Sequence, residues 1–138
     1  MMRVLGLDFG SVRIGVAVSD GLLLTAQGLE TIQRKDLAKD IETIKAVMKE
    51  YDVAEVVVGL PISMNGTHSA KTKETLVFVD ILTKSLQVPV KTYDERLTTM
   101  QAERMLIEAD MSRARRKGLK DMIAAQLILQ AYLDSRKR

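Results

Sequence analysis

The sequence predicts an α/β fold built on a five-stranded mixed sheet, in which three antiparallel strands are extended by parallel βα units and helices cover both faces. Two patterns predict it. Short apolar runs fill the first quarter of the chain, and segments of helical period then alternate with further short runs. At 138 residues, 46% of them hydrophobic and 28% charged, the chain can bury one core. Residues 1–138 are therefore expected to form a single domain.

The first quarter of the chain is expected to form an antiparallel meander. Residues 4–10 make an apolar strand that carries Asp8 near its end, and residues 14–19 follow after a gap of three residues, a spacing typical of a hairpin. A third extended stretch over residues 22–32 would complete the meander, although Gly28 weakens its middle.

From Asp36 onward the apolar period becomes helical, and Asp36 itself is placed to cap the first helix. A continuous β-branched run then predicts a strand covered on both faces and paired in parallel. The expected elements are a helix at 36–51, a strand at 53–59, a helix at 70–86, a strand at 88–93, a helix at 98–109, a basic irregular connection at 112–118 and a helix at 119–133. Three strands followed by this alternation is the RNase H-like order.

Composition narrows the functional classes. The chain has no cysteine, which excludes disulfides and thiol chemistry, and no apolar run approaches the ~20 residues of a membrane span. The amino terminus runs directly into a strand pattern without a signal-peptide cleavage site. We therefore expect a cytoplasmic protein with no membrane partner.

Positive charge is concentrated in the last quarter of the chain, although the net charge is only +3. Basic residues cluster at 113–120 and again at 136–138. Such clusters suit the phosphate backbone of nucleic acid, and they equally suit a solvated loop followed by a basic tail.

Asp8 interrupts an apolar strand pattern. A carboxylate in a segment that otherwise favours burial is costly unless it is paired, hydrogen-bonded or bound to metal. Gly6 and Gly10 are expected to leave room there for a ligand backbone. The alternative is an aspartate in the turn between two hairpin strands.

Two further positions combine a carboxylate with a strand end or a helix start. Asp94 and Glu95 follow the fifth strand directly, and only one of them can share a face with Asp8, because adjacent strand residues point to opposite faces. Asp121 heads an apolar helical stripe, and the alternative there is an ordinary first-turn acid that stabilises the helix dipole.

In a fold of this order, the first strand, a parallel strand and the last helix can converge on one sheet edge. Carboxylates gathered at one point repel each other unless divalent cations bind there. Two Mg²⁺ or Mn²⁺ ions about 3.5–4 Å apart would activate a water and stabilise the leaving oxygen of a phosphodiester. Arg96 and Lys117 would then hold phosphates of the strand that is cut.

Four blocks of sequence, in order, resemble the YqgF family, which is also described as RuvX-type Holliday-junction resolvases and as pre-16S rRNA nucleases. The blocks are residues 7–20 (LDFGSVRIGVAVSD), 58–66 (VGLPISMNG), 94–99 (DERLTT) and 117–125 (KGLKDMIAA). The resemblance implies that Asp8, Glu95 and Asp121 are catalytic and bind metal. It implies that Arg13, Arg96 and Lys117 contact the substrate, and that Thr98 helps to shape the site.

The chain departs from the classical resolvases of this superfamily at the end of the fourth strand. Those enzymes carry an acid there, where this chain has Gly59-Leu60-Pro61, and Glu95 on the fifth strand takes its place. By resemblance the substrate is nucleic acid. We favour the 5′ end of precursor 16S rRNA, with a branched DNA junction as the alternative. The oligomeric state is not readable from the sequence.

Two other functions remain open from the sequence. Residues 6–11, followed by an Ile-Gly-Val strand, also resemble the first phosphate loop of actin-like ATPases and sugar kinases, which need a second lobe that 138 residues do not accommodate. The other is a catalytically silent RNase H-like module that binds RNA or a processing complex. The three carboxylates favour an enzyme over that module.

Overall fold

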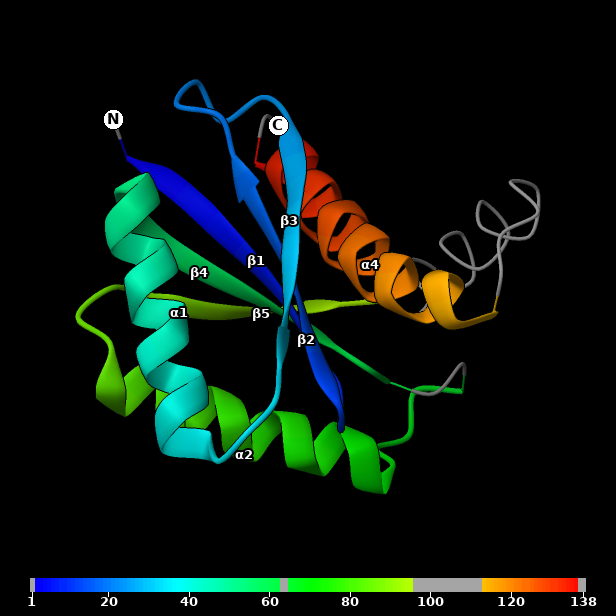
Figure 1. The fold of residues 1–138 in the computed structure, drawn as a ribbon. Coiled ribbons are helices and arrows are strands. Elements are labelled where there is room, and N and C mark those ends of the chain that lie inside the picture. The colour runs from blue at the N-terminus through cyan, green and yellow to red at the C-terminus, as the bar shows by residue number, and fades with distance from the viewer. Residues whose placement is uncertain (1, 63–64, 96–112, 137–138) are drawn as a thin grey trace.

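The computed structural model describes residues 2–62, 65–95 and 113–136, except for the side chains of residues 113–118. A five-stranded sheet in the order β3-β2-β1-β4-β5 forms its centre. Figure 1 shows α1 and α2 on one side of this sheet and α4 on the other. The elements are β1 (Arg3–Phe9), β2 (Arg13–Ser19), β3 (Ala26–Gln33), α1 (Leu37–Tyr51), β4 (Val53–Leu60), α2 (Ala70–Ser85), β5 (Val90–Asp94) and α4 (Arg113–Ser135).

The strand pairing confirms the predicted fold class. β1 pairs antiparallel with β2, and β2 pairs antiparallel with β3, which makes the meander. β4 then lies parallel to β1 on its other side, and β5 lies parallel to β4. The parallel strands bring their carboxyl ends to the same edge of the sheet, and that edge carries the end of β1 with Asp8.

A hydrophobic cluster packs against each face of the sheet. Alternate residues of the central strands, among them Leu5, Leu7 and Val58, pack with Phe78 of α2 and Ile44 of α1 in one core. The intervening residues of the same strands face α4 and form a second cluster, which includes Val4, Val57, Ala125 and Leu129. The alternation puts Asp8, two residues beyond Gly6 and four beyond Val4, on the α4 face.

Helix α4 lies very close to the sheet because glycines stand under it. A Cβ atom at Gly15 of β2 would collide with the main-chain oxygen of Asp121, and one at Gly6 of β1 would lie 2.8 Å from Leu129 Cβ. The expectation that Gly6 makes room for a ligand is therefore wrong, since α4 fills that space. A Cβ atom at Gly10 would lie 2.6 Å from the carbonyl oxygen of Arg13, so the missing side chain of Gly10 permits the β1–β2 turn.

The first helix agrees with the sequence prediction and the last one differs. The Asp36 side chain accepts a hydrogen bond from the main-chain N–H of Lys39 and caps α1, as expected. Helix α4 begins at Arg113, so the predicted irregular connection at 112–118 is wrong from 113 onward. Arginine, lysine and alanine all favour helix, and they outweigh the single Gly118, which costs about 1 kcal/mol.

The remaining expectations on secondary structure hold in outline. β3 starts at Ala26, four residues later than expected, and Gly28 sits beneath Met122 of α4 without ending the strand. The helix predicted at 98–109 lies outside the described residues. Within the described part of the chain, no helix is both long enough and apolar enough to cross a membrane.

Candidate active site

Asp8 lies within β1 and not in the turn that follows it. Its Cα is in register with Gly15 of β2, and its partly buried side chain is on the face covered by α4. Burial is the main cause that raises the pKa of Asp8 from 3.8 to about 6. Lys71 opposes the rise and Asp121 adds to it. Burial therefore disfavours the ionised form of Asp8, and a nearby cation stabilises that form.

Glu95 follows β5 directly, and its main-chain N–H donates to the Leu60 carbonyl oxygen at 3.2 Å, which fixes the end of β5 against β4. The Glu95 side chain is only 4% exposed, whereas neighbouring Asp94 is exposed. Burial, and then the charge of Asp8, raise the pKa of Glu95 from 4.5 to about 8. The two side chains also interact by hydrogen bonding. Of the Asp94–Glu95 pair, the structure thus places Glu95 beside Asp8.

Gly59 is the reason that the Glu95 carboxylate fits. A Cβ atom at Gly59 would lie 2.5 Å from Glu95 Oε2 and would also collide with the side chain of Ile128. The Glu95 carboxylate therefore occupies the space above the end of β4, the strand that carries the acid in classical resolvases. An acid from β5 fills that space from the neighbouring strand.

Asp121 reaches the site from the opposite layer. It lies more than two turns inside α4, which begins at Arg113, so the reading of Asp121 as a first-turn acid is wrong. Its Oδ2 accepts a hydrogen bond from Arg13 Nε at 3.0 Å, and both side chains are about a quarter exposed. Because Asp121 contributes to the raised pKa of Asp8, Asp8 lies within electrostatic range of both Glu95 and Asp121.

Sequence reasoning missed Lys71. This residue stands in the first turn of α2, and its charge opposes the pKa rise of both Asp8 and Glu95. A cation in the first turn of a helix interacts unfavourably with the helix dipole. This unfavourable position was the one feature of the sequence that could have marked Lys71 as a site residue. The helix has no acidic residue in its first turn to offset it. Lys120 of α4 also lowers the pKa of Asp8, to a smaller extent.

The other expected substrate contacts are placed only in part. Arg13 lies in the site, where it pairs with Asp121. Arg96 and Thr98 lie outside the described residues, and Lys117 is described by its backbone only, within α4. Of the basic tail, Arg136 does not extend freely, because its guanidinium donates to Glu55 Oε1 at 3.0 Å and lies over the Tyr132 ring.

Asp8 and Glu95 provide oxygen ligands of the kind that divalent ions bind. Among the described residues, no three His, Cys, Asp or Glu side chains are grouped closely enough to form a complete metal cage. Asp8 and Glu95 are hard oxygen donors in contact, and burial and mutual repulsion disfavour their ionisation. Mg²⁺ commonly uses one or two carboxylates, together with water and substrate phosphate oxygens. This pair therefore fits such an ion, with Asp121 beside it.

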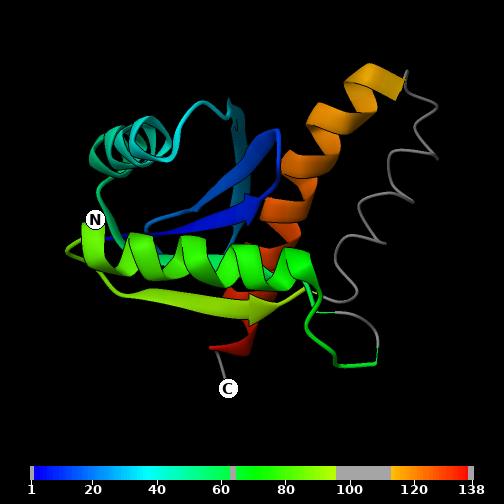
Figure 2. The ribbon, with the colours of Figure 1, turned by 90° about the horizontal axis from the view of Figure 1, so that it is seen from below.

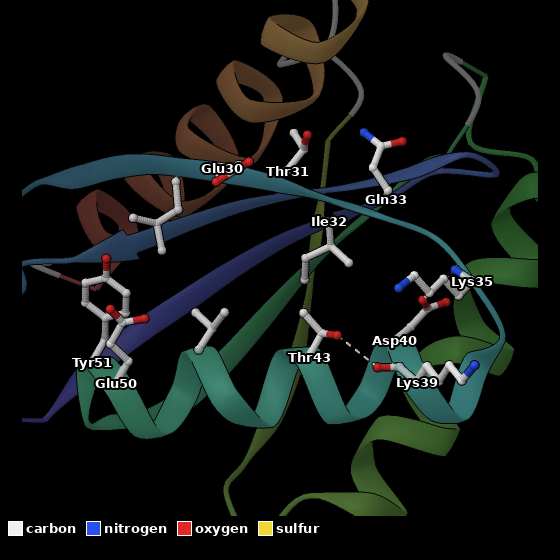
Figure 3. Close-up of a pocket in the computed structure, with 12 residues that line it drawn as sticks. Glu30, Thr31, Ile32, Gln33, Lys35, Lys39, Asp40, Thr43, Glu50 and Tyr51 are labelled. Carbon is white, nitrogen blue, oxygen red and sulfur yellow. Dashed lines mark hydrogen bonds between the residues drawn. The ribbon is translucent and has the colours of Figure 1, made fainter.

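Away from these carboxylates, a cavity of about 560 Å³ lies between β3 and α1 (Figure 3). It contains one buried acid, Asp40, which Figure 3 shows at the lysine-rich end near Lys35 and Lys39. Asp40 accepts from Arg34 Nε at 3.1 Å and from the main-chain N–H of Lys35 at 2.9 Å. Those bonds satisfy the carboxylate and tie the β3–α1 connection to the helix. Asp40 is thus a structural acid, unlike Asp8 and Glu95.

Comparisons with known proteins indicate one family. The sequence profile of RuvX, described as Holliday junction resolvase, matches residues 2–135. A protein of Halothermothrix orenii, provisionally named a pre-16S rRNA nuclease, is 53% identical over 96% of this chain and 95% of its own. A protein of Clostridium novyi with the same provisional name is 50% identical over 97% of this chain and 99% of its own.

Two solved structures share the fold at low sequence identity. Thermus thermophilus RuvC in complex with a Holliday junction substrate superposes with a TM-score of 0.60 at 20% identity, covering 99% of this chain and 96% of that one. The Fowlpox virus resolvase with Holliday junction DNA gives a TM-score of 0.62 at 10% identity, covering 99% of this chain and 100% of that one. At these identities the likeness establishes the RNase H-like fold.

Proposed function

Because the chain belongs to the RuvX family of Holliday junction resolvases, we propose that it is a divalent-metal-dependent nuclease that hydrolyses phosphodiester bonds in nucleic acid. The single observation that carries this proposal is the pair of Asp8 and Glu95. Their side chains interact at one sheet edge, and burial raises the pKa of each. Two like charges in contact destabilise a fold, whereas a site that binds a divalent ion uses such carboxylates as ligands.

Asp8 and Glu95 would hold a Mg²⁺ or Mn²⁺ ion, with Asp121 as a third carboxylate beside them. When bound, such an ion lowers the pKa of a water and neutralises charge on the phosphate. The residues of the chain do the rest. Arg13 holds Asp121 in place through its Nε, Gly59 gives the Glu95 carboxylate its position, and Gly15 lets α4 approach β2. In this proposal Arg96 and Lys117 contact phosphates of the substrate, and Thr98 helps to shape the site.

We favour the 5′ end of precursor 16S rRNA as the substrate. The relatives that are about half identical to this chain over nearly its whole length carry that provisional name. Branched DNA is the second candidate, because the family profile is described by Holliday junction resolution and both structural relatives were solved with junctions. One further proposal follows from RNA processing, namely that the protein acts in the cytoplasm.

One assay decides between the substrates. Purified protein is incubated with Mn²⁺ and, in parallel, a precursor 16S rRNA 5′ leader, a four-way DNA junction and an unrelated single-stranded RNA, at matched salt because phosphate binding depends on it. We expect cleavage of the leader at the mature end. Preferential cutting of the junction would overturn the RNA assignment. No cleavage of any substrate, with binding retained, would favour the silent module.

A further inference from the structure

A second, smaller cavity adjoins the carboxylates. It has a volume of about 250 Å³ and lies between the β1–β2 turn and the start of α2. Phe9, Gly10 and Ser11 form one wall, immediately after Asp8 in the chain. Lys71 and Glu74, which lie three residues apart on α2, form the other. The cavity thus has one cation and one anion among its lining residues, next to the proposed cutting site.

The start of α2 is firmly fixed, so Lys71 has a defined position. Ser69 caps the helix through the main-chain N–H of Thr72, and Thr72 reciprocates through the main-chain N–H of Ser69, which completes a capping box. The Thr72 hydroxyl also donates to the carbonyl oxygen of Pro61, just beyond the end of β4. These bonds connect the first turn of α2 to the strand on which the Glu95 carboxylate rests.

The wall opposite Lys71 is also braced from behind. The Phe9 ring stacks on Phe78 of α2 with centroids 4.0 Å apart, and the Arg34 guanidinium covers the Phe9 ring at 4.5 Å. Arg34 also donates to the Gly10 carbonyl oxygen at 3.5 Å. A cavity with both walls held in this way is preorganised, which is what a binding subsite requires.

Lys71 destabilises the start of α2, and the fold gains no compensating packing contact from its side chain. A cation in the first turn opposes the helix dipole, and Lys71 is exposed, so it contributes no packing. Its charge acts on Asp8 and Glu95, and Asp8 directly precedes Phe9 in the cavity wall. A cation that lines an open cavity within electrostatic range of both carboxylates is placed to meet an anion that arrives beside them.

We propose that this cavity is a phosphate subsite, in which Lys71 binds the backbone phosphate adjacent to the scissile one and Glu74 limits how tightly it is held. The assignment rests on the proposed nuclease function, which supplies the nucleic-acid strand. Lys71 binds the strand from the α2 layer, whereas Arg13 and Asp121 lie on the α4 layer, so the backbone crosses the sheet edge between the two helical layers. Figure 2 shows α2 and α4 flanking that edge.

The test separates binding from cleavage. Binding of a fluorescein-labelled single-stranded RNA is measured by anisotropy in Ca²⁺ over a range of salt concentrations, and cleavage is measured separately in Mn²⁺. Lys71→Gln should weaken binding roughly fivefold to tenfold and reduce the salt slope by about 0.7, the loss of one phosphate contact on a single strand. Lys71→Arg should restore both values. Glu74→Gln should tighten binding, because it removes an anion from the same cavity.

The matched control is Lys73→Gln, an exposed lysine two residues along the same helix that does not line the cavity. It removes the same charge from the protein, so it corrects for long-range attraction. If Lys71→Gln and Lys73→Gln give the same affinity and the same salt slope, the phosphate subsite is refuted. If the parent protein binds RNA but does not cut it, the nuclease proposal fails, and the binding data still decide the role of Lys71.

Discussion

Replacing Gly59 with alanine should remove activity while leaving the fold intact. The new Cβ atom would lie 2.5 Å from Glu95 Oε2, where ordinary contact begins at 3.4 Å, so that oxygen must retreat by about 0.9 Å. The Ile128 side chain is also in the way, with its Cδ1 atom 2.4 Å and its Cγ1 atom 3.1 Å from the new Cβ atom. The ends of both side chains can move by rotation. A catalytic group displaced by about 1 Å costs on the order of 100-fold in rate.

The stability of the Gly59→Ala variant should change little. Overpacking costs roughly 1–3 kcal/mol, and alanine in a strand recovers roughly 0.5–1 kcal/mol relative to glycine. The net loss of about 0–2.5 kcal/mol corresponds to a fall in Tm of at most about 9 °C. The measurements are a circular-dichroism melt and single-turnover cleavage in Mn²⁺. Calorimetric titration with Mn²⁺ should show weaker metal binding by the variant.

Gly15→Ala provides the contrasting control. Its Cβ atom would meet the main-chain oxygen of Asp121, which no side-chain rotation relieves. We expect Gly15→Ala to destabilise the fold by roughly 3 kcal/mol or more. A Gly59→Ala protein that melts like the parent and cleaves within threefold of it would refute the argument, because the position of the Glu95 carboxylate would then not matter.

Three further predictions follow from the same contacts. Asp8→Asn or Asp121→Asn should abolish Mn²⁺-dependent cleavage while binding of nucleic acid stays equal or becomes stronger, and cleavage at the parent rate by either variant would remove the metal site. Asp8 and Glu95 have a higher pKa in the folded protein than in the unfolded chain. Without metal, the free energy of unfolding should therefore fall as pH rises from about 4 to about 8. Mg²⁺ should reverse that loss, and melts that are independent of pH across this window would contradict the burial of the pair. Far from the site, Glu55 accepts from the Tyr132 hydroxyl and pairs with Arg136 and Lys91. Glu55→Ala should cost roughly 1–3 kcal/mol in stability and leave cleavage unchanged in a Mn²⁺ assay below the Tm.

The sequence predicted the elements that depend on local signals. The Asp36 cap, the helical period after it and the β-branched run of β4 each determine one element from neighbouring residues, and all three are as expected. Local geometry also indicated that only one of Asp94 and Glu95 can share a face with Asp8, because adjacent strand residues face opposite layers. The family resemblance, and not the alternation, indicates Glu95, which the structure places beside Asp8.

What the sequence could not provide depends on contacts between distant segments. Gly59 reads as the end of a strand, and only the packing shows that its missing side chain accommodates the Glu95 carboxylate. Lys71 reads as a solvated helical lysine, and its importance comes from facing the end of β1. Gly6 was assigned to a ligand, because a sequence pattern cannot show that a helix more than 110 residues later takes the same space.

The hydrogen bond between Arg13 and Asp121 joins residues 108 positions apart, and α4 is the last element that the structure describes. Chains emerge from the ribosome amino terminus first and fold as they do so. The strands that position Asp8 and Glu95 precede α4, so this pair can meet on the sheet before Asp121 joins it from α4. The proposed site therefore has two stages of assembly, because Arg13 has its Asp121 partner only after α4 docks on the sheet.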